Sequence, residues 1–274
     1  MSRLLVQIQT MKTKYDLIAT RYNATRQADP YLTGRLVYLL GPGSGKQFLD
    51  IGCGTGNYTI VLSNRGLNFT GVEPSENMLR EARKRDGKIN WLQGSAERIP
   101  ANDDTFDGVI ATLTIHHWTG LEQSFKEIYR VTKQNGTVVL FTSTPEQMKG
   151  YWLNYYFPDM LKSSMIQMPA LDVITDALTS AGFADITTEE YFVHEDLKDH
   201  FLYSGKHRPT LYFNEAIRNG ISSFAALANA DEVEKGLSKL AADIETGKFM
   251  EIQNNYNNKR GDYLFIKAKK PLTR

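Results

Sequence analysis

Short hydrophobic runs recur along the chain, and most of them are followed by apolar residues at helical spacing. Runs typical of strands lie at 47–51, 67–73, 90–93, 108–113, 138–141, 186–193 and 262–267. Apolar residues spaced by three or four predict helices near 58–62, 75–82, 121–129 and 171–183. Strands that alternate with helices predict an α/β fold, in which a doubly wound, mostly parallel sheet of seven strands is covered on both faces.

The charge balance gives the chain no strong electrostatic field. Lys and Arg total 32 and Asp and Glu total 31, for a net charge of +1, so we expect neither nucleic acid nor an anionic membrane as a partner. The single cysteine, Cys53, excludes an intramolecular disulfide and a zinc cluster built on cysteines. The apolar stretch at 4–6 is too short for a signal peptide, and no run reaches the roughly 18 residues of a membrane span. We therefore expect a cytoplasmic protein.

A glycine-rich loop follows the first predicted strand. It reads Asp50-Ile51-Gly52-Cys53-Gly54-Thr55-Gly56, and glycines at such a turn let the backbone approach a ligand at a helix N-terminus. The dinucleotide fingerprint G-x-G-x-x-G needs a glycine where this chain has Asn57, and its strand is normally apolar at the position of Asp50. A carboxylate there would repel a pyrophosphate, so the loop suits a different ligand.

Two acidic residues at neighbouring strand ends indicate what that ligand is. Asp50 suits a cationic group, and Glu73, at the end of the next strand, can accept hydrogen bonds from both hydroxyls of a ribose. A nucleoside with an ammonium-bearing tail meets both requirements. The pattern therefore predicts S-adenosylmethionine as the cofactor.

Four motifs in this order resemble the class I S-adenosylmethionine-dependent methyltransferases, and within them the type 11 group of small-molecule enzymes. The motifs are Leu49-Asp50-Ile51-Gly52-Cys53-Gly54-Thr55-Gly56, Gly71-Val72-Glu73-Pro74-Ser75, Gln93-Gly94-Ser95-Ala96-Glu97 and Phe106-Asp107-Gly108-Val109-Ile110. The resemblance is close over residues 46 to 145 and looser elsewhere. It implies a Rossmann-like sheet with a discontinuous helical cap.

The resemblance also implies a set of cofactor-binding residues. The glycines would line the methionine portion, Glu73 would hold the ribose, and the segment after the third strand would meet the adenine edge. A tyrosine and an arginine near the N-terminus would close over the cofactor, with Arg26 pairing with its carboxylate. Cys53 fits between two glycines because it is small, and packing explains it better than nucleophilic catalysis does. The full set is Tyr22, Arg26, Asp50, Gly52, Cys53, Gly54, Gly56, Glu73, Pro74, Met78, Ser95, Ala96, Glu97 and Thr112.

The catalytic candidate is His117, in the segment His116-His117-Trp118 after the fourth strand. Its imidazole is either a general base or a group that orients the loop. No metal site is expected, because no carboxylates cluster around the two histidines. The aromatic stretch from Tyr151 to Phe157 is interpreted as packing within the cap, with a pocket wall as the alternative. The basic run at 80–88 is interpreted as a solvated helix face.

These inferences assign the segments of the chain to a core and a cap, and they predict its function. A cofactor-binding core over 46–145 continues in 169–194 and ends with a strand and tail over 259–274, while an N-terminal cap (1–45), a lid segment (146–168) and a helical insertion (195–258) surround it. We expect a methyltransferase that acts on an oxygen, nitrogen or carbon atom of a small-molecule acceptor. An RNA or protein methyltransferase, and a non-catalytic regulator that binds S-adenosylmethionine, are the alternatives.

Overall fold

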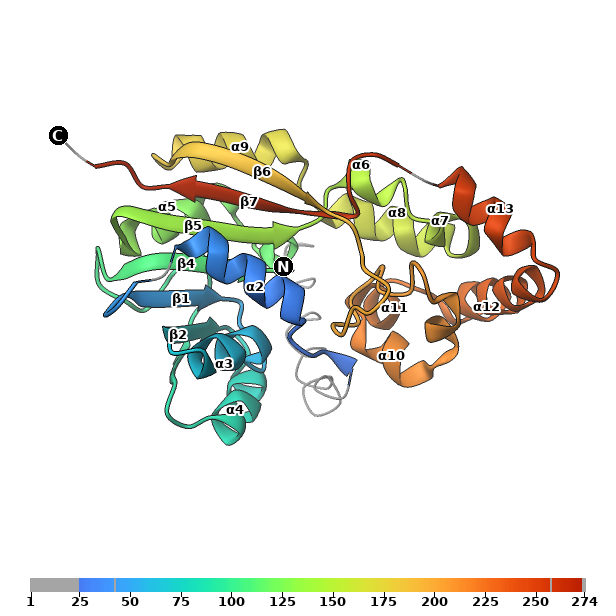
Figure 1. The fold of residues 1–274 in the computed structure, drawn as a ribbon, viewed down its shortest axis with the longest axis horizontal. Helices are drawn as coiled ribbons and strands as arrows, with labels where there is room; N and C mark the ends of the chain where they lie inside the picture. The colour runs from blue at the N-terminus through green and yellow to red at the C-terminus, as the bar shows by residue number, and fades with distance from the viewer. Residues whose placement is uncertain (1–24, 42, 257, 273–274) are drawn as a thin grey trace, which may run out of the picture.

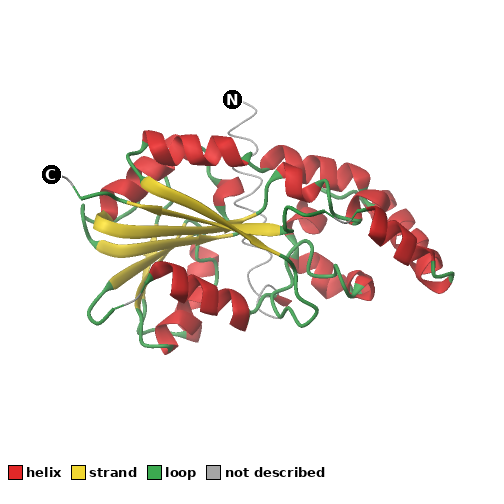
Figure 2. Ribbon diagram, turned by 45° about the horizontal axis from the view of Figure 1, so that its top comes forward, coloured by secondary structure: helices red, strands yellow, loops and turns green. Residues whose placement is uncertain are grey.

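The computed structural model describes residues 25–41, 43–256 and 258–272 and has a seven-stranded sheet at its centre (Figures 1 and 2). The strand order is β3-β2-β1-β4-β5-β7-β6. All neighbouring strands are parallel except β7, which is antiparallel to both β5 and β6. The expected fold class is thus confirmed. The strands are β1 (Gln47–Ile51), β2 (Asn68–Glu73), β3 (Asn90–Gln93), β4 (Phe106–Thr112), β5 (Thr132–Thr142), β6 (Ala184–Tyr191) and β7 (Tyr263–Lys269).

Helices cover both faces of this sheet because its central strands are apolar on both sides. In β1, Phe48 belongs to a core that contains α2 (Pro30–Leu40) and α3 (Asn57–Asn64). The next residue, Leu49, belongs to the opposite core, with α5 (Leu121–Val131) and α9 (Leu171–Ser180). A further helix, α4 (Glu76–Arg85), packs on β2 and β3. Figure 1 shows α2 in front of the strands, and Figure 2 shows helices on both sides of the sheet.

Local sequence signals explain where two of these helices begin. Asp29 precedes α2, and its Oδ1 accepts hydrogen bonds from the backbone N–H groups of Tyr31 and Leu32 while Pro30 occupies the first turn. Ser75 caps α4 by accepting a bond from Met78 N–H. Both caps satisfy amide groups that a helix cannot satisfy by itself.

The largest departure from the predicted elements is at the start of β5. The predicted strand covers 138–141, whereas α5 ends at Val131 and β5 already begins at Thr132, before the turn signal Asn135-Gly136. Asn135 lies inside the strand with a φ of 62°, next to a shift in the register between β4 and β5. The turn signal therefore marks an irregular strand, in which asparagine tolerates the left-handed conformation.

The remaining helices gather beyond the carboxyl end of β5 (Figure 1). Residues between β5 and α9 form α6 (Pro145–Met148), α7 (Leu153–Tyr156) and α8 (Pro158–Gln167), and residues between β6 and β7 form η2 (Pro209–Phe213), α10 (Glu215–Gly220), α11 (Ser222–Ala226), α12 (Ala230–Glu245) and α13 (Lys248–Asn255). The two segments pack together, since α12 contacts α7 and α11 contacts α8. Ser164 Oγ donates a hydrogen bond to Ser223 Oγ at 2.7 Å across that contact.

The aromatic stretch forms the interior of this helical unit. Tyr151, Trp152 and Phe157 are fully buried. The ring of Tyr151 stacks on Tyr203 with centroids 4.0 Å apart, and Trp152 meets Tyr212 edge to face. These rings pack against one another, which favours the packing interpretation over a pocket wall. Over the described ranges, the helices are too short or too polar to cross a bilayer.

The division into core, lid and insertion stays a prediction. Within the segment assigned to an N-terminal cap, α2 packs on α3, β4 and β5. This helix therefore contributes to the layer that covers the sheet.

Candidate cofactor site at the glycine loop

The glycine loop joins the end of β1 to the start of α3. Gly52, Gly54 and Gly56 have φ values of +71°, +56° and +79°, in the left-handed region that glycine adopts without strain. The N–H groups of Gly52 and Cys53 both donate to the carbonyl of Val72, at 2.8 and 3.1 Å. The loop is thereby fastened to β2, and α3 begins directly after it.

The three glycines have different neighbours. A Cβ on Gly52 would lie 2.1 Å from Thr114 Oγ1, and one on Gly56 would lie 2.4 Å from the ring of Trp91. A Cβ on Gly54 would meet no described atom within 4 Å. Gly52 and Gly56 therefore allow parts of the protein to approach the loop, while Gly54 leaves open space beside the backbone that a ligand can occupy.

Cys53 belongs to the packing beneath the loop. It lies in a small cluster with Leu79, Ala82 and Trp91. Burial, and then the nearby carboxyl groups of Asp50 and Glu73, raise the pKa of its thiol well above the ordinary value. A thiol that resists ionisation is a poor nucleophile, which supports the structural role. Trp91 was not singled out in the sequence, since nothing in its strand pattern shows that its ring supports this loop.

Asp50 is a buried carboxyl group at the end of β1. It is 1% exposed, and Thr59 Oγ1 donates a 2.6 Å hydrogen bond to its Oδ2. Its Oδ1 is buried and accepts no hydrogen bond from the part of the chain that the structure describes. Burial, partly offset by the Thr59 bond and reinforced by Glu73, raises its pKa to about 7. An unsatisfied buried acceptor of this kind suits a cationic donor.

Glu73 lies at the end of β2, next to the loop. Its Oε2 accepts the Gly54 N–H at 3.1 Å and its Oε1 accepts the Ser75 N–H at 3.0 Å. Burial raises its pKa, although these two bonds oppose the shift. Each carboxylate oxygen can accept a further hydrogen bond. Glu73 is thus oriented by the backbone and can still bind a pair of hydroxyl groups.

The residues expected around an adenine lie on adjoining segments. Glu73 pairs with Gln93 across β2 and β3, which places the loops after both strands side by side. Met78 and Ala96 are buried, whereas Pro74 is exposed. Ser95 forms an isolated bridge with Arg98. The structure therefore brings these predicted residues to the carboxyl ends of β2 and β3, on the side of the sheet where the glycine loop follows β1.

Glu97 anchors the segment after β4. Its Oε1 accepts bonds from Thr119 N–H at 2.6 Å and from Thr119 Oγ1 at 2.9 Å. Burial acts to raise its pKa, but hydrogen bonds from Ser95 and Thr119 outweigh that effect and lower it. Its predicted contact with adenine stays a prediction, and the structure gives this carboxylate a second function.

The two histidines lie in a short helix that is held at both ends. This helix, η1 (Ile115–His117), follows Thr114, which packs on Gly52, and precedes Thr119, which is bound by Glu97. His116 and His117 are therefore fixed beside the glycine loop, with ring centroids 3.8 Å apart. Thr112, at the end of β4, is half-buried just before them.

Burial keeps both imidazoles neutral. It lowers the pKa of His116 to about 4, with a contribution from Arg26, and it lowers the pKa of His117 well below 6.5, with a contribution from His116. A neutral imidazole can accept a proton at physiological pH. A strongly lowered pKa weakens it as a general base, because proton transfer to it gains less free energy.

Arg26 is bound to the helical insertion. Its guanidinium forms an ion pair with Asp199. Its backbone carbonyl accepts a hydrogen bond from Asn57 Nδ2 at 2.9 Å, at the first residue of α3. Arg26 therefore lies next to the glycine loop, and its pairing with a cofactor carboxylate stays a prediction. Tyr22 lies outside the described residues.

The basic run on α4 is only partly a solvated face. Lys84 forms an exposed ion pair with Glu81, in agreement with the prediction. Arg85 differs, because its Nη1 donates to the carbonyl of Thr55 at 2.8 Å and to Asn57 Oδ1 at 2.5 Å. Arg85 thus ties α4 to the glycine loop. Charge patterning within α4 contains no signal for a contact so far away in sequence.

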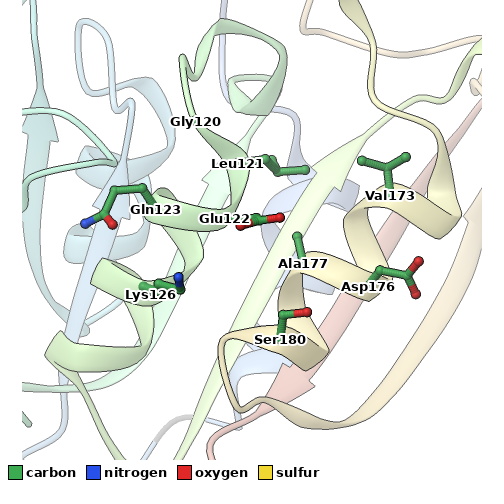
Figure 3. A pocket seen from close by; sticks show the side chains of 9 residues that line it. All are labelled: Gly120, Leu121, Glu122, Gln123, Lys126, Val173, Asp176, Ala177 and Ser180. Carbon is green, nitrogen blue, oxygen red and sulfur yellow. The ribbon is translucent and has the colours of Figure 1, made fainter.

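Two further observations concern other sites. The ranges that the structure describes hold no group of three or more His, Cys, Asp or Glu residues arranged to bind a metal ion. A pocket of about 630 Å³ lies between α5 and α9 (Figure 3). None of the predicted cofactor-binding residues lines it. Its lining is Gly120, Leu121, Glu122, Gln123, Lys126, Val173, Asp176, Ala177 and Ser180.

The sheet order, the glycine loop and the two acidic strand ends define a class I S-adenosylmethionine-dependent methyltransferase, and comparisons with known proteins agree. The methyltransferase domain family matches residues 49–140. A crystal structure of a proposed methyltransferase from an antibiotic biosynthesis pathway of Anabaena variabilis is 36% identical, with a TM-score of 0.80. The match covers 89% of this chain and 99% of that one. The chain belongs to this methyltransferase family.

Curated relatives match over shorter stretches. The malonyl-[acyl-carrier protein] O-methyltransferase of Serratia marcescens is 30% identical over 138 residues, which are 50% of this chain and 54% of that protein. The demethylmenaquinone methyltransferase of Shouchella clausii is 28% identical over 176 residues, covering 54% of this chain and 74% of that protein. The chain thus spans about half the length of the first of these relatives. Both relatives are methyltransferases by name.

Proposed function

We propose that the chain binds S-adenosylmethionine at the glycine loop and transfers its methyl group to a small-molecule acceptor. The observation that carries the proposal is the open space at Gly54 beside two buried carboxyl groups. Asp50 has an unsatisfied buried oxygen that fits the ammonium group of the cofactor. Glu73 is held by backbone N–H groups in a position that fits the ribose.

When bound, the cofactor supplies an activated methyl group on a sulfonium. The acceptor atom forms a bond to the methyl carbon as the carbon–sulfur bond breaks, and the acceptor's proton passes to a base or to water. The chain therefore has to align the two reactants and exclude solvent, and alignment alone can supply about 7 to 11 kcal/mol. In this proposal His117, fixed at the end of β4, accepts the proton directly or positions the acceptor.

The acceptor site is proposed to lie between the carboxyl ends of β4 and β5 and the helical unit. Helices from two distant segments pack into that unit beyond β5, so it can roof a compact site (Figure 1). By their names, the relatives above act on malonyl-[acyl-carrier protein] and on demethylmenaquinone, and both are candidate acceptor classes. The near-neutral charge of the chain favours a small molecule over RNA.

Turnover of S-adenosylmethionine labelled in its methyl group, measured against a panel of small acids, phenols and amines, tests the proposal. Label should pass to at least one of these compounds. Transfer only to RNA or to protein side chains would favour a macromolecular acceptor. Binding of the cofactor without any transfer across all three classes would favour a regulator.

A further inference from the structure

Three segments that are distant in sequence meet beside the glycine loop. They are residues 25–29, the first turn of α3, and residues 198–200 of the insertion between β6 and β7. We call the contact the clasp, and define it by Arg26, Asp29, Asn57, Tyr58 and Asp199. All five belong to the described chain, so the contact can be followed bond by bond.

Asp199 is at the centre of the clasp. Its side chain is 2% exposed, and both of its oxygens are bound by Arg26, whose Nη2 donates to Oδ2 at 3.3 Å. Tyr58 OH donates to the same Oδ2 at 3.1 Å. Burial, followed by the effect of Asp199, raises the pKa of Tyr58 well above its ordinary value, so this phenol remains a donor.

Backbone bonds complete the connection. Lys198 N–H donates to Asp29 Oδ2 at 3.1 Å, and His200 N–H donates to the carbonyl of Thr25 at 3.2 Å. On the other side, Asn57 Nδ2 donates to the carbonyl of Arg26 at 2.9 Å. The insertion is thus connected to the first turn of α3 directly through Tyr58, and also through residues 25–29, which Asn57 binds directly after Gly56.

We propose that Asp199 is a positioning residue that holds Arg26 against the first turn of α3 and thereby fixes the insertion relative to the glycine loop. A buried carboxylate that loses its cationic partner is strongly disfavoured, so the ion pair selects one arrangement of the three segments. Cofactor binding at the loop and the position of the insertion are then coupled. The inference rests on the proposed function, because the ligand that uses this coupling is the cofactor.

Asp243 offers a matched control within the same insertion. It is a buried carboxyl group in α12 whose Oδ2 accepts a hydrogen bond from Tyr156 OH at 3.1 Å. A lysine, Lys248, lies 3.9 Å away. Asp243→Asn thus also alters a buried tyrosine–carboxylate bond and an ion pair, but none of its partners belongs to the clasp.

Amide hydrogen exchange of the ligand-free protein tests the positioning role. In Asp199→Asn, amides of residues 54–60 should exchange at least about tenfold faster, together with those of 198–200, because the three segments open together. Asp243→Asn should leave residues 54–60 unchanged. Tyr58→Phe, which keeps the ion pair, should give a smaller change in the same direction and serves if Asp199→Asn does not fold. Unchanged exchange at 54–60 in Asp199→Asn, or equal changes in Asp243→Asn, would overturn the proposal.

Calorimetric titration with S-adenosylhomocysteine tests whether the position of the insertion is coupled to ligand binding at the glycine loop. Asp199→Asn should weaken binding by about tenfold, while Asp243→Asn should bind like the wild type. Equal or tighter binding by Asp199→Asn would overturn the coupling and show that Asp199 competes for Arg26. If the wild type binds no S-adenosylhomocysteine although exchange at 54–60 responds to Asp199→Asn, the proposed function fails and the positioning role stands.

Discussion

The glycine loop and the insertion between β6 and β7 reach the same end of the sheet by different means. The loop and its two carboxyl groups come from strand ends close in sequence, and backbone bonds from Gly52, Cys53 and Gly54 fix them. The insertion is held by side chains such as Asp199, whose partners lie far away in the chain. The proposed cofactor site is therefore encoded locally, whereas the position of the insertion depends on tertiary contacts.

Among substitutions in these two regions, we expect Gly54→Val to weaken cofactor binding most. The new side chain would occupy the open space beside the loop, so S-adenosylhomocysteine binding should fall by more than about a hundredfold, a loss above roughly 2.7 kcal/mol. Gly66→Val is the matched control, because Gly66 also has a positive φ and no described atom near its Cβ position, but lies in the turn after α3. Both variants should lose about 1 to 3 kcal/mol of stability from strain, measured by denaturant unfolding. Normal binding by Gly54→Val would exclude this loop as the cofactor site.

His117→Ala tests the role of the imidazole that we propose to lie between the glycine loop and the acceptor site. If the imidazole is a general base, turnover should fall by about a hundredfold or more, while S-adenosylhomocysteine affinity changes little. Because the pKa of His117 lies well below 6.5, the wild-type rate should show no inflection from this residue between pH 6 and 8. Steady-state kinetics with the acceptor found in the panel give both results. Unaltered turnover would make the histidine structural, with positioning alone responsible for the reaction.

Glu73→Ala should have a smaller effect confined to cofactor affinity. Ribose hydroxyls lose a charged acceptor, a loss on the order of 1.5 to 3 kcal/mol in binding. Glu73→Gln, which keeps an acceptor oxygen for one of the two backbone N–H groups, should lose less affinity than Glu73→Ala. Titration calorimetry of the two variants gives the comparison, and an affinity equal to that of the wild type in both would refute the ribose assignment.

The effect that is smallest per unit of pH is a pH dependence of stability assigned to Asp50. Its pKa rises from 3.8 to about 7 on folding, so its contribution to stability is complete below about pH 4 and is lost as the pH rises to about 7. The slope cannot exceed about 1.4 kcal/mol per pH unit. Asp50→Asn should remove this slope from denaturant unfolding measured between pH 4 and 7.

The same carboxyl group should release a proton when a cationic ligand binds. S-adenosylhomocysteine carries an ammonium group that favours the ionised form of Asp50, so its affinity should increase as the pH approaches 7. Calorimetry in two buffers of different ionisation enthalpy measures the proton released. If the wild type and Asp50→Asn release the same number of protons on binding, the ammonium group binds elsewhere.

The sequence predicted the strands, the fold class and the family because each rests on a local pattern. Short apolar runs mark β1 to β7, and the glycine spacing after β1 is readable without knowing any contact. The supports of the loop were missed for the opposite reason. Trp91 under Gly56, Arg85 on Thr55 and Asp199 on Arg26 are contacts between segments that no periodicity relates.

For the aromatic stretch, the sequence predicted burial but not which surroundings the rings have. Residues Tyr151 to Phe157 were recognisable as buried, but composition does not distinguish a pocket wall from the interior of a helical unit. The stacking of Tyr151 on Tyr203 favours the interior, since the two residues come from different segments that meet only in the fold.

Titration of the wild-type protein with S-adenosylmethionine, S-adenosylhomocysteine and NADH is the most direct test of the central claim. Both sulfur-containing ligands should bind and should stabilise the protein by about 2.7 kcal/mol at a hundredfold excess over the dissociation constant, whereas NADH should change nothing. Absence of binding by both S-adenosyl compounds, or a stabilisation by NADH alone, would contradict the assignment of the glycine loop as a methyl-donor site.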